Sequence, residues 1–225
     1  MKIIGFDKCR VSMLVDLLEI GTRDGLYFPG AATLLQSKFN FISIPQPASQ
    51  ANPKEVLCFE HGFFNYEGRD INIRAFEIYP HGLVAQAADS NAAEIFLDEF
   101  SAFATAELGQ VAEGLIGRKF FASSLMVQFD KEANGFLSAN EKIIALFSNH
   151  LKATYGLEQK AELSRISMRP DPDKLNARVG SLLTEFTLER RINAPYEDQK
   201  FYSTAPLRTD DHIAFLQKIE KLALN

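Results

Sequence analysis

Histidine, cysteine and tryptophan are scarce in this chain, whose 225 residues include four His, two Cys and no Trp. The spacing of Cys9 and Cys58 matches neither a CxxC motif nor any zinc-ligand pattern. Nothing in the sequence suggests a metal site or a cofactor. We therefore expect free thiols in the reducing environment of the cytoplasm.

Short motifs of common catalytic sites are also missing. The chain has no GxGxxG, no GxSxG and no HExxH. The stretch GLIGRK at 114–119 has its glycines too close together for a phosphate-binding loop, and no Ser or Thr follows its lysine. No apolar run approaches membrane-spanning length, and MKIIGFDKCR lacks the apolar core of a signal peptide. These absences favour a cytoplasmic protein that does not contact membranes.

The charge balance argues against a general nucleic-acid binder, because 24 Lys and Arg face 29 Asp and Glu, for a net charge of −5. Arginines nevertheless gather in the last third of the chain. Four of them are candidate anion-binding residues: Arg165, Arg169, Arg190 and Arg208. Whether they contact phosphate or form an ordinary solvated surface is left open by the sequence.

Phenylalanine is abundant, with nineteen residues. A Phe-rich core can be dry and tightly packed, because the ring carries no polar group that needs a partner. The same composition could line a cavity for an apolar ligand. Both readings stay open at this stage.

Two stretches share a similar layout. Residues 55–108 predict three strands and then a helix that buries Phe96, Phe100 and Phe103, and a shift in the apolar phase predicts a β-bulge near Ala75. Residues 163–225 also predict three strands and a final helix over 210–223. The two stretches hint at an architectural repeat, although the similarity is too weak to claim a duplication.

Between these stretches, residues 119–130 alternate as a strand and 138–155 predict a helix. Ser138 and Glu141 have the spacing of a capping box at its start. Asn91 and Glu94 have the same spacing in the earlier helix.

The first fifty residues are harder to interpret. KIIGF predicts a short strand, whereas the spacing of Val11, Leu14, Val15 and Leu18 is typical of a helix. Residues 38–44 are a candidate strand, and 45–53 resemble a linker. We expect one α+β domain over 1–225, with a possible subdivision near 45–53. Its largely antiparallel sheet of seven or more strands forms β-meanders and carries about three helices on one face.

The stretch TAPLRTDDH at 204–212 places two acids beside a histidine. Thr209 suits the N-cap of the last helix, and Asp210 and Asp211 in the first turn would each gain about 0.3–1 kcal/mol from the helix dipole. This structural interpretation explains both acids but does not require His212.

A catalytic interpretation would join His212 with Asp210 or Asp211, and with His61 from elsewhere in the chain. Neighbouring residues lie about 100° apart around a helix, so this cluster is no ready chelate. Arg190 interrupts the apolar face of its strand, and a buried arginine needs a carboxylate or an anionic ligand.

Three functional hypotheses follow. The leading one is a non-catalytic cytoplasmic protein that acts through protein–protein contacts, as a homo-oligomer or as a subunit of a larger assembly. The alternative is an enzyme with a dispersed acid, His and Arg site that acts on an anionic substrate. The third is a binder of apolar ligands in a Phe-lined cavity.

Overall fold

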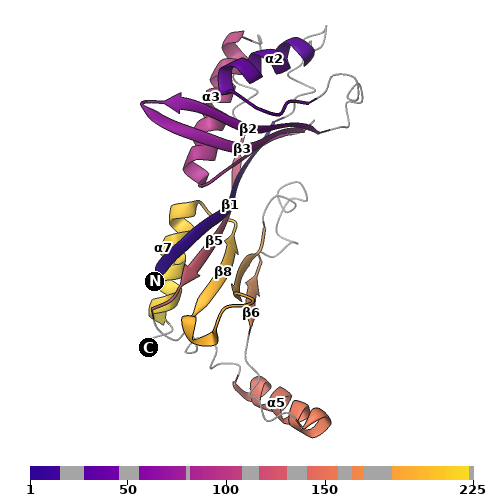
Figure 1. The fold of residues 1–225 in the computed structure, drawn as a ribbon, viewed down its shortest axis with the longest axis vertical. Helices are drawn as coiled ribbons and strands as arrows, with labels where there is room; N and C mark the ends of the chain where they lie inside the picture. Colours follow the sequence, from indigo (N-terminus) through magenta and orange to yellow (C-terminus); the bar gives the residue numbers. More distant parts are fainter. Residues whose placement is uncertain are drawn as a thin grey trace.

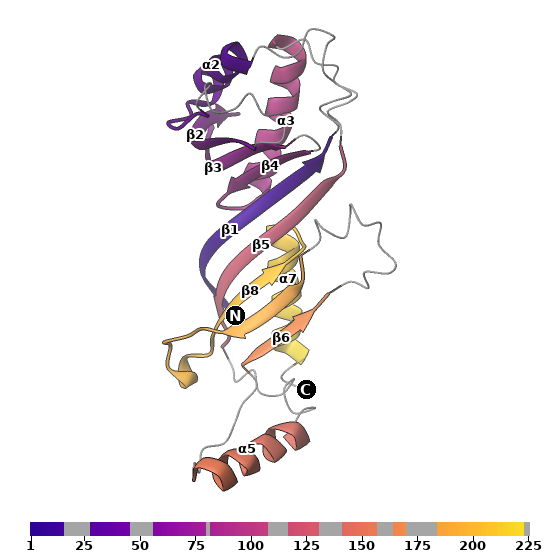
Figure 2. The ribbon, with the colours of Figure 1, turned by 90° about the vertical axis from the view of Figure 1, so that its right-hand side faces the viewer.

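The structure is a computed structural model whose central feature is one antiparallel sheet of eight strands, in the order β2-β3-β4-β1-β5-β8-β7-β6 (Figures 1 and 2). The residues it describes are 1–15, 28–45, 56–79, 82–107, 117–130, 141–156, 164–169 and 184–222. The strands are Lys2–Leu14 (β1), Leu57–Tyr66 (β2), Arg69–Tyr79 (β3), Gly82–Ala87 (β4), Lys119–Gln128 (β5), Arg165–Met168 (β6), Phe186–Arg190 (β7) and Lys200–Ala205 (β8). The fold is α+β, as the sequence predicts.

The described part of the chain contains four helices where the sequence predicts about three. They are Phe28–Phe39 (α2), Ser90–Glu107 (α3), Glu141–Tyr155 (α5) and Thr209–Leu222 (α7), with a short 3₁₀ turn at Tyr196–Asp198 (η4). Helices α2, α3 and α7 lie against one face of the sheet, whereas α5 stands beyond its end (Figure 2). None of these helices has the length and apolar character needed to cross a membrane.

The elements follow one order twice along the described chain. A strand, a helix, three strands and a helix run from β1 to α3, and the same order runs from β5 to α7 with η4 inserted. The sheet order is symmetric about the central β1–β5 pair, with β2 and β6 at the two edges. The single domain over 1–225 stays a prediction, and so does the weak architectural repeat.

Strand β1 corrects the expectation of a helix around Val11 and Leu14. The strand continues to Leu14, because it pairs with β4 on one side and with β5 on the other. Cys9, Val11 and Met13 alternate as buried residues on the helix-covered face. The helical spacing of the apolar residues is therefore a coincidence, and the burial follows the two-residue alternation of a strand.

The predicted bulge near Ala75 is confirmed, since the β3–β4 register shifts between Ile73 and Ala75. The candidate strand at 38–44 is wrong. Helix α2 continues to Phe39, and only an isolated bridge joins Ser43 to Glu60. The linker-like stretch lies almost wholly outside the described residues, as does Ser138 of the predicted capping box.

Two apolar cores fill the space between the sheet and its helices. The larger one, under α2 and α3, is a cluster of phenylalanine rings. Phe96 lies in the middle of this cluster. The centre of its ring is 4.9 Å from the ring centre of Phe39 and also 4.9 Å from that of Phe76. The smaller core lies under α7 and contains Leu125, Leu188 and Leu216. The Phe-rich core expected from the composition is confirmed, and its rings pack against one another.

Candidate functional site

The N-termini of α3 and α7 meet at Ser90 and Thr209. The backbone amide of Ser90 donates to Thr209 Oγ1 at 2.9 Å, and the amide of Thr209 donates to Ser90 Oγ at 2.9 Å. Both residues are buried. The amides of Ser90 and Thr209 thus each receive a side-chain acceptor from the other helix, 119 residues away. We call this contact the helix junction.

The predicted N-cap role of Thr209 is corrected by this geometry. The first backbone hydrogen bond of α7 runs from the amide of His212 to the carbonyl of Arg208. Thr209 is therefore already the first residue of the helix, which begins one residue earlier than predicted. In α3 the side chain of Asp89 accepts the amide of Ala92 at 2.8 Å and acts as the N-cap. The predicted partner Glu94 is instead engaged by Lys119 and Arg208.

His212 is fully buried at the start of α7, between two strands of the sheet. Ser123 Oγ of β5 lies 2.8 Å from its Nδ1, and Ser203 Oγ of β8 lies 2.9 Å from its Nε2. Ser203 donates its single hydroxyl proton to the carbonyl of Thr187 at 2.7 Å. It must therefore accept from His212, so Nε2 carries the ring proton and Nδ1 accepts from Ser123.

In the neutral imidazole Nδ1 carries no proton and accepts from the hydroxyl of Ser123, whereas a proton on Nδ1 would require this hydroxyl to turn and accept instead. Burial lowers the pKa of His212 from 6.5 to about 4. Both ring nitrogens are engaged and the ring has no exposed surface. The arrangement anchors α7 to β5 and β8.

The polar cluster around His212 occurs in one half of the sheet only. The strand registers show which residues occupy the corresponding positions in the other half. Ala85 of β4 pairs with Val11, as Ser203 of β8 pairs with Leu125, so Ala85 and Ser203 occupy corresponding positions. Ala93 follows Ser90 by three residues, as His212 follows Thr209. The first half thus has two alanines where the second has Ser203 and His212.

The other residues of the catalytic hypothesis do not join His212. Asp210 and Asp211 are exposed on the first turn of α7. His61 is exposed on β2, in the other half of the sheet, with a positive φ of 55°. The structure brings His212 together with two serines that the sequence analysis did not single out. No local signal marks them, because Ser123 lies 89 residues away in the sequence.

Arg208 contacts side chains near the helix junction. Its guanidinium pairs with Glu94 and lies 4.3 Å from the ring centre of Phe121. Lys119 is 3.3 Å from the same carboxylate. Burial opposes ionisation of Glu94, but the hydrogen bonds and charges of Arg208 and Lys119 prevail and lower its pKa. Arg208 therefore has a carboxylate partner within the chain.

The remaining candidate arginines lie apart from this cluster. Arg190 places its guanidinium 5.0 Å from the ring centre of Phe201. Arg165 on the edge strand β6 pairs with Glu185 at 2.6 Å, and Arg169 is exposed just beyond that strand. The anion-binding role of these four arginines stays a prediction.

A polar network on the sheet face opposite the helices was not anticipated from the sequence. Glu77 accepts hydrogen bonds from Tyr79 and Gln86, each at 2.7 Å, and Arg10 lies 3.3 Å from the same carboxylate. Burial, followed by the contact with Glu77, raises the pKa of Tyr79. Three adjacent strands, β1, β3 and β4, are linked by this one carboxylate.

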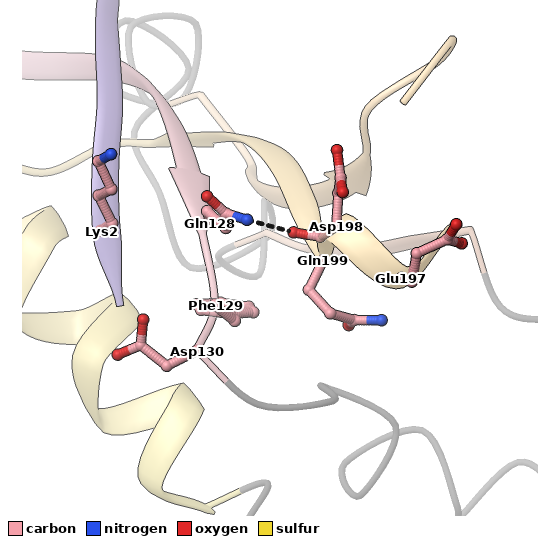
Figure 3. Close-up of a pocket in the computed structure, with 7 residues that line it drawn as sticks. All are labelled: Lys2, Gln128, Phe129, Asp130, Glu197, Asp198 and Gln199. Atoms are coloured by element: carbon pink, nitrogen blue, oxygen red, sulfur yellow. Dashed lines mark hydrogen bonds between the residues drawn. The ribbon is translucent and has the colours of Figure 1, made fainter. Parts of the chain in front are cut away.

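An open pocket of about 430 Å³ lies where β5 ends beside η4 (Figure 3). Two of its lining residues are joined directly, since Gln128 donates to the carbonyl of Asp198 at 2.9 Å. Asp198 is paired with Lys200 at 2.7 Å, and Asp130 with the amino group of Met1. Its other lining residues are Lys2, Phe129, Glu197 and Gln199. Its two aspartates already have cationic partners within the chain.

Among the described residues, no group of three or more His, Cys, Asp or Glu is placed to hold a metal ion. Cys9 is buried with its Sγ 3.3 Å from Thr209 Oγ1, and Cys58 is half-buried. Burial raises the pKa of both thiols, which keeps them protonated and unreactive near neutral pH.

Among the described residues, helix α5 carries several exposed apolar side chains close together. Leu146 is 61% exposed, Phe147 is 57% exposed, and Tyr155 at the end of the helix is exposed as well. Figures 1 and 2 both show α5 separated from the sheet and from the other helices. We call the residues Ile144, Phe147 and Leu151, which share one side of this helix, the α5 stripe.

Comparisons with known proteins found no family model and no curated protein that matches this chain.

Proposed function

We propose that this is a non-catalytic cytoplasmic protein that acts through protein–protein contacts, and that α5 is its main contact surface. The observation that carries this proposal is the exposure of Phe147 on a helix that Figures 1 and 2 show apart from the sheet and from the other helices. Exposed apolar surface of this kind is typical of interaction sites.

The length of α5 adds a thermodynamic argument. An isolated helix of about 12–15 residues is marginal in water, and helices of this size gain most of their stability from packing an apolar face. Helix α5 has 15 residues and places Phe147 in solvent. A partner that covers the α5 stripe would supply the missing packing.

The proposal is tested by replacing Phe147 with glutamine, which keeps helix propensity and removes the ring. Light scattering coupled to size exclusion should show that Phe147→Gln loses the association of the unmodified chain. Phe63→Gln is the matched control, because Phe63 is 52% exposed on β2 and lies outside α5.

Two results would count against the proposal. One is an unmodified chain that stays monomeric and retains no partner during purification. The other is an equal loss of association in Phe147→Gln and Phe63→Gln, which would move the contact surface away from α5.

A further inference from the structure

The two halves of the sheet differ in how the helix after the first strand is used. In the first half, α2 follows β1 and packs on the helix-covered face over β2. There the ring centres of Phe39 and Phe64 are 5.4 Å apart. The same helix contacts α3 through Phe39 and Phe96. In the second half, α5 follows β5 but lies beyond the end of the sheet (Figure 2).

The apolar spacing of α5 matches that of α2. Helix α2 buries residues at the spacing i, i+1, i+4 and i+8, namely Ala31, Ala32, Leu35 and Phe39. The sequence of α5 repeats this spacing with Ile143, Ile144, Phe147 and Leu151. Such a pattern fits a helix that packs one face against a sheet.

Among the described residues of the second half, no helix covers the place that corresponds to the position of α2. Met168 of β6 pairs with Phe186, so it lies on the helix-covered face, yet it is 50% exposed. Phe215 of α7, which follows Thr209 by six residues as Phe96 follows Ser90, is only partly buried. We call Ile166, Met168, Phe215 and Ile219 the β6–α7 strip. Of these four residues, Phe215 and Ile219 are partly buried against the smaller core.

We propose that the α5 stripe of one copy of this chain packs on the β6–α7 strip of a second copy, in the position that α2 occupies within the first half. This inference rests on the proposed function and names its partner. Because α5 stands beyond the end of its own sheet, the strip that it reaches without rearrangement belongs to another copy. When each copy places its α5 stripe on the β6–α7 strip of the other, the same contact forms twice. The result is a closed dimer with two-fold symmetry.

The test uses two differently tagged chains, both with Cys58→Ser, which leaves only the buried Cys9. One chain carries Leu146→Cys beside the α5 stripe, and the other carries Arg169→Cys beside the β6–α7 strip. Both positions are exposed, and neither belongs to the proposed contact. A short bismaleimide should link the two tags when the chains are mixed. Adding Phe147→Gln to the first chain should reduce this product at least about tenfold.

Other products would overturn the inference in recognisable ways. A linkage at monomer mass in one chain carrying both cysteines would show that α5 folds back on its own sheet. Linkage of the Leu146→Cys chain to itself would show that two α5 helices pack together. If the unmodified chain associates but the mixed product is missing, this inference fails while the proposed function stands. A monomeric unmodified chain would overturn this inference, and it would overturn the proposed function as well if it retains no other protein partner.

Discussion

Ser90 and Thr209 cap each other across the helix junction, each hydroxyl oxygen accepting the backbone amide of the other residue at 2.9 Å. Because both residues are buried, water cannot replace either acceptor. The first turns of α3 and α7 are therefore fixed to one another, at the middle of the sheet.

Thr209→Val keeps the shape of the side chain but removes the acceptor for the amide of Ser90. We expect a loss of about 1–3 kcal/mol in the free energy of unfolding, because a buried amide is left unpaired. Urea titration measures this loss. Thr209→Ser keeps the hydroxyl and is the control. If the Val and Ser variants are equally stable, the reciprocal capping has no energetic role.

Because burial lowers the pKa of His212, we predict that the stability of the fold depends on pH. The imidazole of the unfolded chain takes up a proton below about 6.5, whereas the buried ring resists protonation until about pH 4. The stabilising contribution is therefore complete above pH 6.5 and is lost as the pH falls towards 4. The loss amounts to about 3 kcal/mol.

The contribution of His212 can be separated from those of the carboxylates by comparing the unmodified chain with His212→Gln. The glutamine offers one donor and one acceptor but does not titrate. Unfolding free energies measured between pH 7 and pH 4.5 should fall more steeply for the unmodified chain. Parallel curves for the two proteins would contradict the buried neutral histidine.

The position of Gly117 leads us to predict a steric effect that the sequence does not indicate. A Cβ atom at this position would lie 1.8 Å from the carbonyl oxygen of Leu14, at the end of β1. Gly117→Ala must displace backbone, and we expect a cost of about 1–3 kcal/mol or more. Gly5→Ala is the matched control, because its Cβ meets only the flexible end of Met126 at 3.0 Å. Equal thermal stabilities of the two variants would contradict this packing.

The sequence predicts residues 55–108 and 163–225 better than it predicts the first fifty residues. Strand β8 and helix α7 follow from clear alternation and from a clear apolar stripe, whereas β1 does not. Val11, Leu14 and Val15 satisfy a helical spacing, while Cys9, Val11 and Met13 satisfy a strand spacing. Pairing with β4 and β5 on both sides decides between them, and no local pattern encodes that pairing.

The partners of the TDDH cluster could not be predicted for a related reason. The acids of the first turn are explained by the helix dipole alone, and the structure leaves them exposed. Thr209 and His212 instead contact residues brought from α3, β5 and β8. Which residues face the start of α7 depends on the sheet order, and that order is a property of the whole chain.

Sedimentation equilibrium of the unmodified chain over a range of concentrations is the most direct test of association through α5. We expect a mass that rises with concentration towards twice the 25.2 kDa of one chain, and a single-chain mass for Phe147→Gln. A mass of one chain at every concentration, unchanged by the substitution, would contradict the two-fold dimer.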